Sequence, residues 1–170
     1  MKKRFTSIEE KRELFLKLYD SQSDGLYRHC YFRLSNKTEA EQMVQEAYTR
    51  LWDYFLRKRF LEYPKALLYR IANNLIIDWY RKRKESSLDA LQEGGMQFRS
   101  EQDKELTLGI EIKELKATIL CLDQKYQQIL LLRYVNDCSV KEIAQTLSLN
   151  ENTVSVRIHR AIKELRKHYA

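Results

Sequence analysis

The feature that most narrows the fold is a shortage of turn-forming residues: four glycines and one proline in 170 residues. Tight β-turns depend on these residue types, because glycine reaches positive φ and proline fixes φ near −65°. The chain therefore does not have the composition of an all-β protein with many short connections. Hydrophobic residues make up 44% of the chain, which is enough for a core. We expect an all-α protein of two small helical domains joined by a flexible linker.

Capping residues and hydrophobic spacing predict the helices of the first half. Ser7 with Glu10, and Thr38 with Glu41, have the spacing of capping boxes, in which each side chain satisfies a free backbone N–H. We expect the first helix to break near Gly25. The helix that follows Thr38 is strongly amphipathic, with an apolar side formed by Val44, Ala47, Tyr48, Leu51, Trp52 and Phe55.

A third helix, about 65–82, is predicted to follow Pro64, because proline suits a first helical turn. Its apolar stripe consists of Leu68, Ile71, Ala72, Leu75 and Trp79. Residues 84–103 lose this periodicity, gain serine and glycine and turn acidic, which is typical of a linker. The predicted division is a first domain at 7–84, an acidic linker at 85–103 and a second domain at 104–168.

Residues 139–165 carry the pattern of a helix-turn-helix. A short helix capped by Ser139 is followed by a turn and then by a longer basic helix capped by Asn150. Ala144 supplies the small residue needed where the helices cross, and Leu149 fills the turn. The second helix is expected to bury Val154, Ile158, Ile162 and Leu165. It then presents a set suited to the major groove of duplex DNA: Asn152, Thr153, Ser155, Val156, Arg157, His159, Arg160 and Lys163. The alternative is an ordinary helical hairpin with a solvated basic face.

The net charge of +7 is divided unevenly. Residues 57–84 carry nine Lys and Arg against two acids, and residues 133–170 carry seven against four. Between them, residues 85–114 carry three against eight. Two basic blocks separated by an acidic segment indicate a polyanion bound at two places.

In the first basic block, aromatic residues lie among the cations. This combination suits unpaired bases, because rings stack on bases while Lys and Arg hold the backbone. Trp79 is equally compatible with a place in the core and with base contact. The predicted set for this surface is Arg57, Lys58, Arg59, Phe60, Tyr63, Lys65, Arg70, Asn73, Asn74, Asp78 and Arg81.

The sequence contains no motif for catalysis, a cofactor or a metal. It has neither a glycine-rich phosphate loop nor an HExxH pattern, and the three histidines do not group with cysteines or acids: His29, His159 and His168. We expect the three cysteines to be small buried hydrophobic residues: Cys30, Cys121 and Cys138. No apolar run approaches the roughly 20 residues of a membrane span, and the charged first residues lack a signal core, so we expect a cytoplasmic protein.

These residues, in this order, resemble the extracytoplasmic-function (group 4) sigma factors of bacterial RNA polymerase. Residues 15–55 resemble regions 2.1 and 2.2, through VQEA and RLW. Residues 63–84 resemble regions 2.3 and 2.4, through LYRIANN, and residues 122–165 resemble region 4. The resemblance implies a non-enzymatic subunit that binds core polymerase and directs initiation from −10 and −35 promoter elements.

The resemblance also implies roles for individual residues. The VQEA helix would bind the clamp helices of the largest polymerase subunit, and the polymerase flap is a further expected contact. The loop at about 57–65 and Asn74, with Asp78 one turn on, would hold a flipped −10 base. An anti-sigma factor is an expected partner. The implied clamp residues are Gln42, Gln45, Glu46, Arg50 and Asp53. The implied −35 residues are Ser155, Val156, Arg157, His159 and Arg160.

Several positions depart from the family pattern. Gln42 stands where Asp is frequent, and Asp123 follows Leu122 where Pro is frequent. Ser148 stands where Gly is frequent, and a left-handed backbone there would cost serine about 1 kcal/mol. Two other classes of function stay open: a DNA-binding regulator that uses only its helix-turn-helix, and an antagonist that binds polymerase without initiating.

Overall fold

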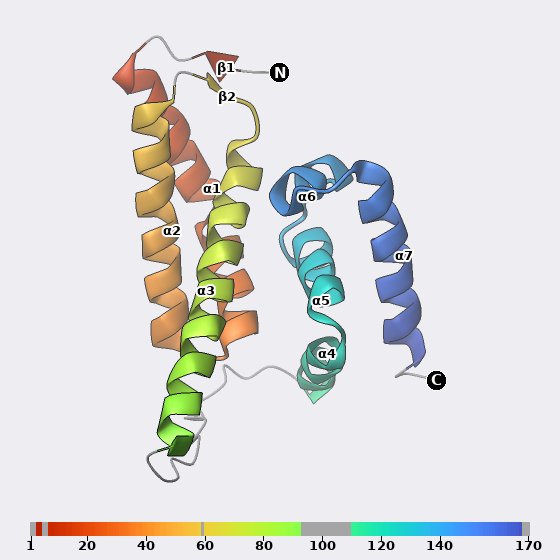
Figure 1. The fold of residues 1–170 in the computed structure, drawn as a ribbon. Helices are drawn as coiled ribbons and strands as arrows, with labels where there is room; N and C mark the ends of the chain where they lie inside the picture. Colours follow the sequence, from red (N-terminus) through yellow and green to blue (C-terminus); the bar gives the residue numbers. More distant parts are fainter. Residues whose placement is uncertain (1–2, 5–6, 59, 93–109, 168–170) are drawn as a thin grey trace.

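The computed structural model describes residues 3–4, 7–58, 60–92 and 110–167. These form a helical structure, which confirms the expected fold class (Figure 1). The helices are α1 (Ile8–Leu34), α2 (Lys37–Arg57), α3 (Pro64–Gln92), α4 (Ile110–Cys121), α5 (Gln124–Leu130), a π-helical turn (Leu131–Val135), α6 (Val140–Leu147) and α7 (Glu151–Lys167). The two-residue strands β1 (Lys3–Arg4) and β2 (Phe60–Leu61) pair antiparallel.

The N-terminal unit, from β1 to α3, is a bundle of three helices. Its core is built from the apolar sides of α1, α2 and α3, with Leu26, Leu51, Phe55 and Leu68 fully buried. Phe15 of α1 adds edge-to-face contacts with aromatic rings of α2, including Trp52 at a centroid distance of 5.2 Å.

The helix starts follow the sequence signals in part. Ser7 caps α1, accepting a hydrogen bond from the Glu10 N–H at 3.2 Å, as predicted. The prediction that Thr38 caps the second helix is wrong. Asn36 is the cap and accepts from the Glu39 N–H at 3.0 Å. The preceding residue, Ser35, ends α1 in the left-handed conformation and thereby turns the chain directly into this cap.

The predicted break near Gly25 does not occur, since α1 is continuous from Ile8 to Leu34. Gly25 serves close packing instead. A Cβ added there would lie 3.0 Å from the Tyr69 hydroxyl, and the Gly25 carbonyl accepts a hydrogen bond from the Asn136 side chain at 2.9 Å. The glycine allows α1 to approach these two side chains.

α3 is longer and more buried than predicted. It continues to Gln92, so residues 85–92 are helical where a linker is expected, and 93–103 lie outside the described residues. Along its first half the helix is buried on more than the predicted stripe. The additional buried residues are Ala66, Leu67, Tyr69, Asn73 and Ile76.

The C-terminal unit, α4 to α7, contains the predicted helix-turn-helix. Ser139 and Glu142 form a complete capping box at the start of α6. α5 runs into the π-helical turn, which ends at Val135. Asp137, two residues later, has φ 47° and redirects the chain. Leu122, Leu130 and Ala161 are the buried centre between α5 and α7.

The two units pack against each other. α6 lies along the first half of α3, and the π-helical turn contacts α1 (Figure 1). One buried cluster contains residues of both units, among them Leu68 and Tyr69 of α3 and Ile129, Leu132 and Ile143 of the C-terminal unit.

Ser148, at the end of α6, has φ 54° and ψ 45°, which is the strained conformation expected for this position. Replacing it by glycine, Ser148→Gly, removes the clash of the Cβ with the backbone. We expect the free energy of unfolding to rise by about 1 kcal/mol in urea titrations. The matched control is Ser139→Gly at the other end of α6. It removes a capping side chain and should lower the free energy of unfolding by a few tenths of a kcal/mol. Equal changes in the two variants would contradict this account.

Candidate protein and nucleic-acid interfaces

α7 is held across α6 by the turn between them. The Leu149 N–H donates to the Ala144 carbonyl at 2.9 Å, across the left-handed Ser148. Ala144 is buried at the crossing, and Val154 is fully buried beneath the first turns of α7. This arrangement leaves the opposite side of α7 projecting away from the unit, as a recognition helix requires.

The outer side of α7 carries the residues predicted for duplex DNA. Asn150 caps the helix, accepting from the Thr153 N–H at 2.7 Å. Thr153 and Arg157 are half-buried, and Val156 is 42% exposed. The exposed members of the predicted set are Asn152, Ser155, Val156, His159, Arg160 and Lys163.

The surface of α3 predicted for unpaired bases is only partly accessible. Asn74 is exposed, and one turn on Asp78 pairs with Arg81 at 3.2 Å. Arg70 is half-buried. Asn73 was expected on this surface, and that expectation is wrong: it is 3% exposed and faces α1. The local pattern does not distinguish Asn73 from Asn74, because only tertiary packing decides which of two adjacent amides is covered.

Asn73 belongs to a buried polar cluster between the units. Its Oδ1 accepts from Nη1 of Arg33 at 2.7 Å and lies 3.3 Å from Nε2 of His29. Nδ1 of the same histidine lies 2.9 Å from Oδ1 of Asn136, in the C-terminal unit. The sequence analysis missed this cluster, since its members are up to 107 positions apart.

The cluster is short of hydrogen-bond partners. Both ring nitrogens of His29 face amide oxygens, but a neutral imidazole has only one N–H to donate. Burial and the neighbouring Arg33 guanidinium lower the pKa of His29 to about 4, so the ring is neutral at pH 7. Among the described residues, Nη2 of Arg33 and Nδ2 of Asn73 have no hydrogen-bond partner.

The C-terminal unit contacts the residue before α3 and the first turn of α3. Nζ of Lys65 donates to the Asp137 carbonyl at 3.2 Å, and Nζ of Lys141 lies 5.4 Å from the centre of the Tyr63 ring. Both Tyr63 and Lys65 are half-buried. Elsewhere in the predicted set, Arg57 and Lys58 are exposed, Phe60 lies in β2, and Arg59 lies outside the described residues.

Trp79 packs against the core of the N-terminal unit. Its Nε1 donates to Oε2 of Glu39 at 3.0 Å, and the Arg83 guanidinium lies 4.9 Å from its ring centre. Of the two roles left open by the sequence, these contacts favour the structural one.

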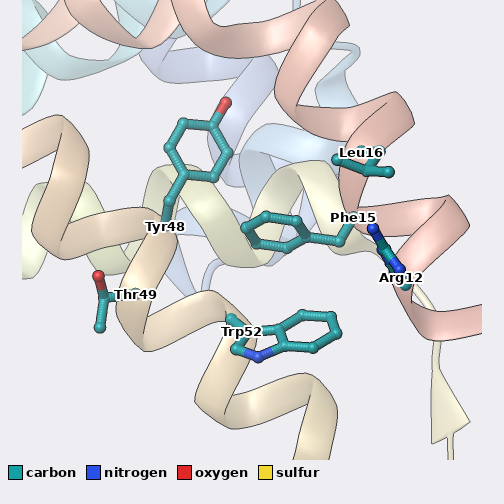
Figure 2. A pocket seen from close by; sticks show the side chains of 6 residues that line it. All are labelled: Arg12, Phe15, Leu16, Tyr48, Thr49 and Trp52. Atoms are coloured by element: carbon teal, nitrogen blue, oxygen red, sulfur yellow. The ribbon is translucent and has the colours of Figure 1, made fainter. Parts of the chain in front are cut away.

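An apolar hollow of about 430 Å³ opens between α1 and α2 (Figure 2). The sequence analysis did not single out this hollow. The available signal was an additional apolar residue beside Phe15 in the first predicted helix: Leu16 follows it directly and is 47% exposed. Its lining residues are Arg12, Phe15, Leu16, Tyr48, Thr49 and Trp52.

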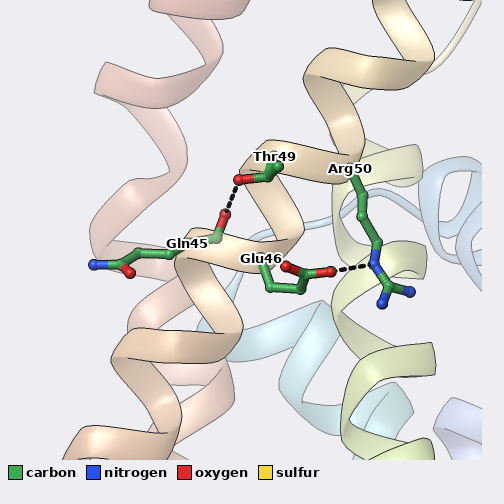
Figure 3. Close-up of polar contacts among 4 residues, drawn as sticks. All are labelled: Gln45, Glu46, Thr49 and Arg50. Carbon is green, nitrogen blue, oxygen red and sulfur yellow. Dashed lines mark hydrogen bonds and ion pairs between the residues drawn. The ribbon is translucent and has the colours of Figure 1, made fainter.

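Beside the hollow, α2 presents the polar side predicted to bind polymerase (Figure 3). Glu46 and Arg50 form an ion pair one turn apart, with Oε1 and Nε separated by 2.6 Å. The pair is about half exposed, so it adds little stability and its groups stay available to a partner. All members of the predicted set are exposed: Gln42, Gln45, Glu46, Arg50 and Asp53.

The cysteines do not all follow the prediction. Cys30 and Cys138 are buried, and burial raises the pKa of their thiols to about 12 and about 11. Cys121 is exposed, so its expected burial is wrong. The residues described by the structure contain no cluster of metal-binding side chains. In the same part of the chain, no helix is long and apolar enough to cross a membrane.

Two family models match separate parts of the chain. The model "Sigma-70 region 2" matches residues 18–86, and "Sigma-70, region 4" matches residues 112–165. The first includes most of α1, all of α2 and most of α3, and the second includes the helix-turn-helix.

Curated relatives and solved structures agree with these matches. The ECF RNA polymerase sigma factor SigW of Bacillus subtilis (strain 168) is 32% identical over 98% of this chain and 95% of its own length. SigX of the same organism is 27% identical over 92% of this chain and 84% of its own length. The sigma factor RpoE, solved with the anti-sigma factor NepR from Bartonella quintana, shares the fold with a TM-score of 0.69 at 19% identity, covering 95% of this chain and 96% of RpoE. CnrH, solved with the cytosolic domain of CnrY, has a TM-score of 0.66 at 21% identity. The match covers 93% of this chain and 88% of CnrH. The chain belongs to the extracytoplasmic-function (ECF) sigma factors of the sigma-70 family.

Proposed function

We propose that this chain directs promoter-specific transcription initiation by dividing two tasks between its units. Residues 7–84 would bind core RNA polymerase and open the −10 element, residues 104–168 would bind the −35 element, and 85–103 would connect them. The observation that carries this proposal is the presence, in one chain, of an exposed helix-turn-helix surface and a second exposed polar surface on α3. Two weak contacts joined by a tether gain affinity through effective concentration.

The −35 contact would be made by the exposed side of α7. Arg160 can bond bidentately to guanine or to phosphate, and Asn152 and Ser155 are suited to bases or phosphates. The −10 contact would be made by Asn74 with Asp78 one turn on, and by the loop at 57–65. Asn73 is 3% exposed and would make no direct DNA contact.

The polar side of α2 would bind the clamp helices of polymerase, with the flap as a contact of the C-terminal unit. In this role the chain is a regulatory subunit that acts in the cytoplasm and catalyses no reaction itself. RpoE and CnrH were solved with NepR and with the cytosolic domain of CnrY, respectively. We propose that an anti-sigma factor likewise binds this chain.

In vitro transcription with core polymerase tests the proposal. We expect the full chain plus core polymerase to yield specific run-off transcripts from fragments of the host genome, and neither component to do so alone. A regulator that uses only its helix-turn-helix would instead protect DNA from nuclease by itself and yield no transcript with core. That result would overturn the sigma assignment.

Asn74→Ala separates promoter opening from polymerase binding. Loss of the amide should reduce the fraction of open complex, measured by permanganate reactivity of unpaired thymines, by about tenfold, the equivalent of one charge-assisted or bidentate contact. Binding to core polymerase should be unchanged, because Asn74 lies on α3 and not on the polar side of α2. The control is Gln124→Ala, which removes an exposed amide from α5. Equal losses in core binding and opening would indicate a folding role for Asn74.

Arg160→Ala tests the −35 surface. In the holoenzyme we expect it to weaken −35-dependent promoter binding by about 1–3 kcal/mol, as for the loss of a base-contacting arginine. Arg166→Ala removes the same charge from an exposed position in the last turn of α7 and should have a smaller, sequence-independent effect. If the two variants behave alike on matched and mutated −35 sequences, Arg160 is not part of the recognition surface.

A further inference from the structure

The strand β1 pairs with the connection between α2 and α3 (Figure 1). Its Lys3 lies opposite Leu61 in antiparallel register. Arg4 lies opposite Phe60. The whole of α1 and α2 lies between the two strands in the sequence, so their pairing is a tertiary contact and not a local hairpin. Since β2 belongs to the segment at 57–65, β1 lies next to the loop proposed above to hold an unpaired −10 base.

The helices hold the two ends of this connection. Nζ of Lys11 on α1 donates to the Leu56 carbonyl near the end of α2 at 3.2 Å. At the other end, the Leu67 N–H donates to the Tyr63 carbonyl at 2.9 Å, in the first turn of α3. Between these ends β2 is extended, and an extended segment satisfies its backbone groups through a neighbouring strand or water. The hydrogen-bonded pairing with β1 therefore fixes the backbone in the middle of the connection.

This pairing also determines which residues of the loop share a face. Successive residues of a strand point to opposite faces, so a slip of one position would exchange the places of Phe60 and Leu61. An aromatic residue stacks on a base only from the face at which the base is bound. A loop without a fixed backbone would in addition lose conformational entropy on binding, which weakens affinity. Base binding at this loop thus depends on its register and on its order.

The residues that β1 brings to the loop are both cationic. They join Arg57 and Lys58, which are exposed at the end of α2. Cations beside an aromatic residue, here Phe60, are the combination that suits an unpaired strand. The sequence analysis did not assign Lys3 and Arg4 to this surface, because two helices separate them from the first basic block.

We propose that β1 is a positioning strand of the −10 surface, and that its backbone pairing with β2 holds the loop before α3 in the conformation that binds unpaired bases. Lys3 and Arg4 act in this role through their backbone and not by reading a base. The effect on base binding rests on the function proposed above, whereas the pairing of the strands does not.

Two double variants of the full chain separate the backbone of β1 from its side chains. Lys3→Pro with Arg4→Pro removes both backbone N–H groups, whichever of the two residue pairs exchanges the hydrogen bonds. Lys3→Ala with Arg4→Ala is the matched control, since it removes the same two charges and keeps both N–H groups. Both positions precede α1, so we expect circular dichroism to show equal helix content. If the double proline variant does not fold, each proline substitution is used singly.

Hydrogen–deuterium exchange tests the pairing in the free chain. Peptides that contain β2 should exchange several-fold faster in the proline variant than in the alanine variant, because the backbone of β2 loses its partner. Exchange in the helical peptides of α2 and α3 should be the same in both variants. Equal exchange of the β2 peptides would show that β1 does not hold the loop and would overturn the proposal.

The effect on base binding is measured in the holoenzyme, at a promoter that yields a run-off transcript with the native chain. By permanganate reactivity we expect about tenfold less open complex with the proline variant than with the alanine variant, as for a loop that must be ordered on binding. Binding to core polymerase and −35-dependent binding should be equal in the two variants.

Equal opening by the two variants would overturn the positioning role of β1 while leaving the sigma assignment intact. A parallel loss of core binding in the proline variant would indicate a general defect of the N-terminal unit and would also overturn it. Failure of the sigma assignment appears separately, as absence of run-off transcripts with the native chain.

Discussion

The structure depends on the burial of α3 from two directions. α1 and α2 cover one side of its first half, and α6 covers another, so Leu68 and Tyr69 are both fully buried although they are adjacent. A helix that is covered almost all round must be apolar almost all round. This explains why the segment from Ala66 to Ile76 contains so few charged residues, and why its one buried amide, Asn73, needs partners from α1.

This double burial also marks the limit of what the sequence could predict. The stripe of Leu68, Ala72 and Leu75 follows from helical periodicity and is buried as predicted. Ala66 and Tyr69 are buried by a second partner, and a single helical pattern does not reveal how many partners a helix has. The long-range contacts between His29 and Asn136 leave no local signal for the same reason.

Local sequence signals gave correct predictions for features that depend on contacts within a few residues, such as helix caps. Ser7, Ser139 and Asn150 cap their helices as predicted, because a cap needs only a side-chain oxygen and an N–H three residues on. Thr38 failed because Asn36 offered a competing cap of the same kind two residues earlier. The exposed sides of α2 and α7 were likewise predictable, since each belongs to a strongly amphipathic helix with one covered side.

The polar groups between the units weaken their contact. Apolar residues in place of Asn73 and Asn136 would bury the same area without unpaired donors, and such replacements often stabilise an interface. The amides instead hold His29 between two acceptor oxygens, of which a neutral ring can satisfy one. If the units separate, water can solvate His29, Arg33 and both amides. This solvation offsets part of the free-energy cost of exposing the apolar surface between the units. Each unpaired polar group therefore makes the contact between the units weaker than an apolar interface of the same area.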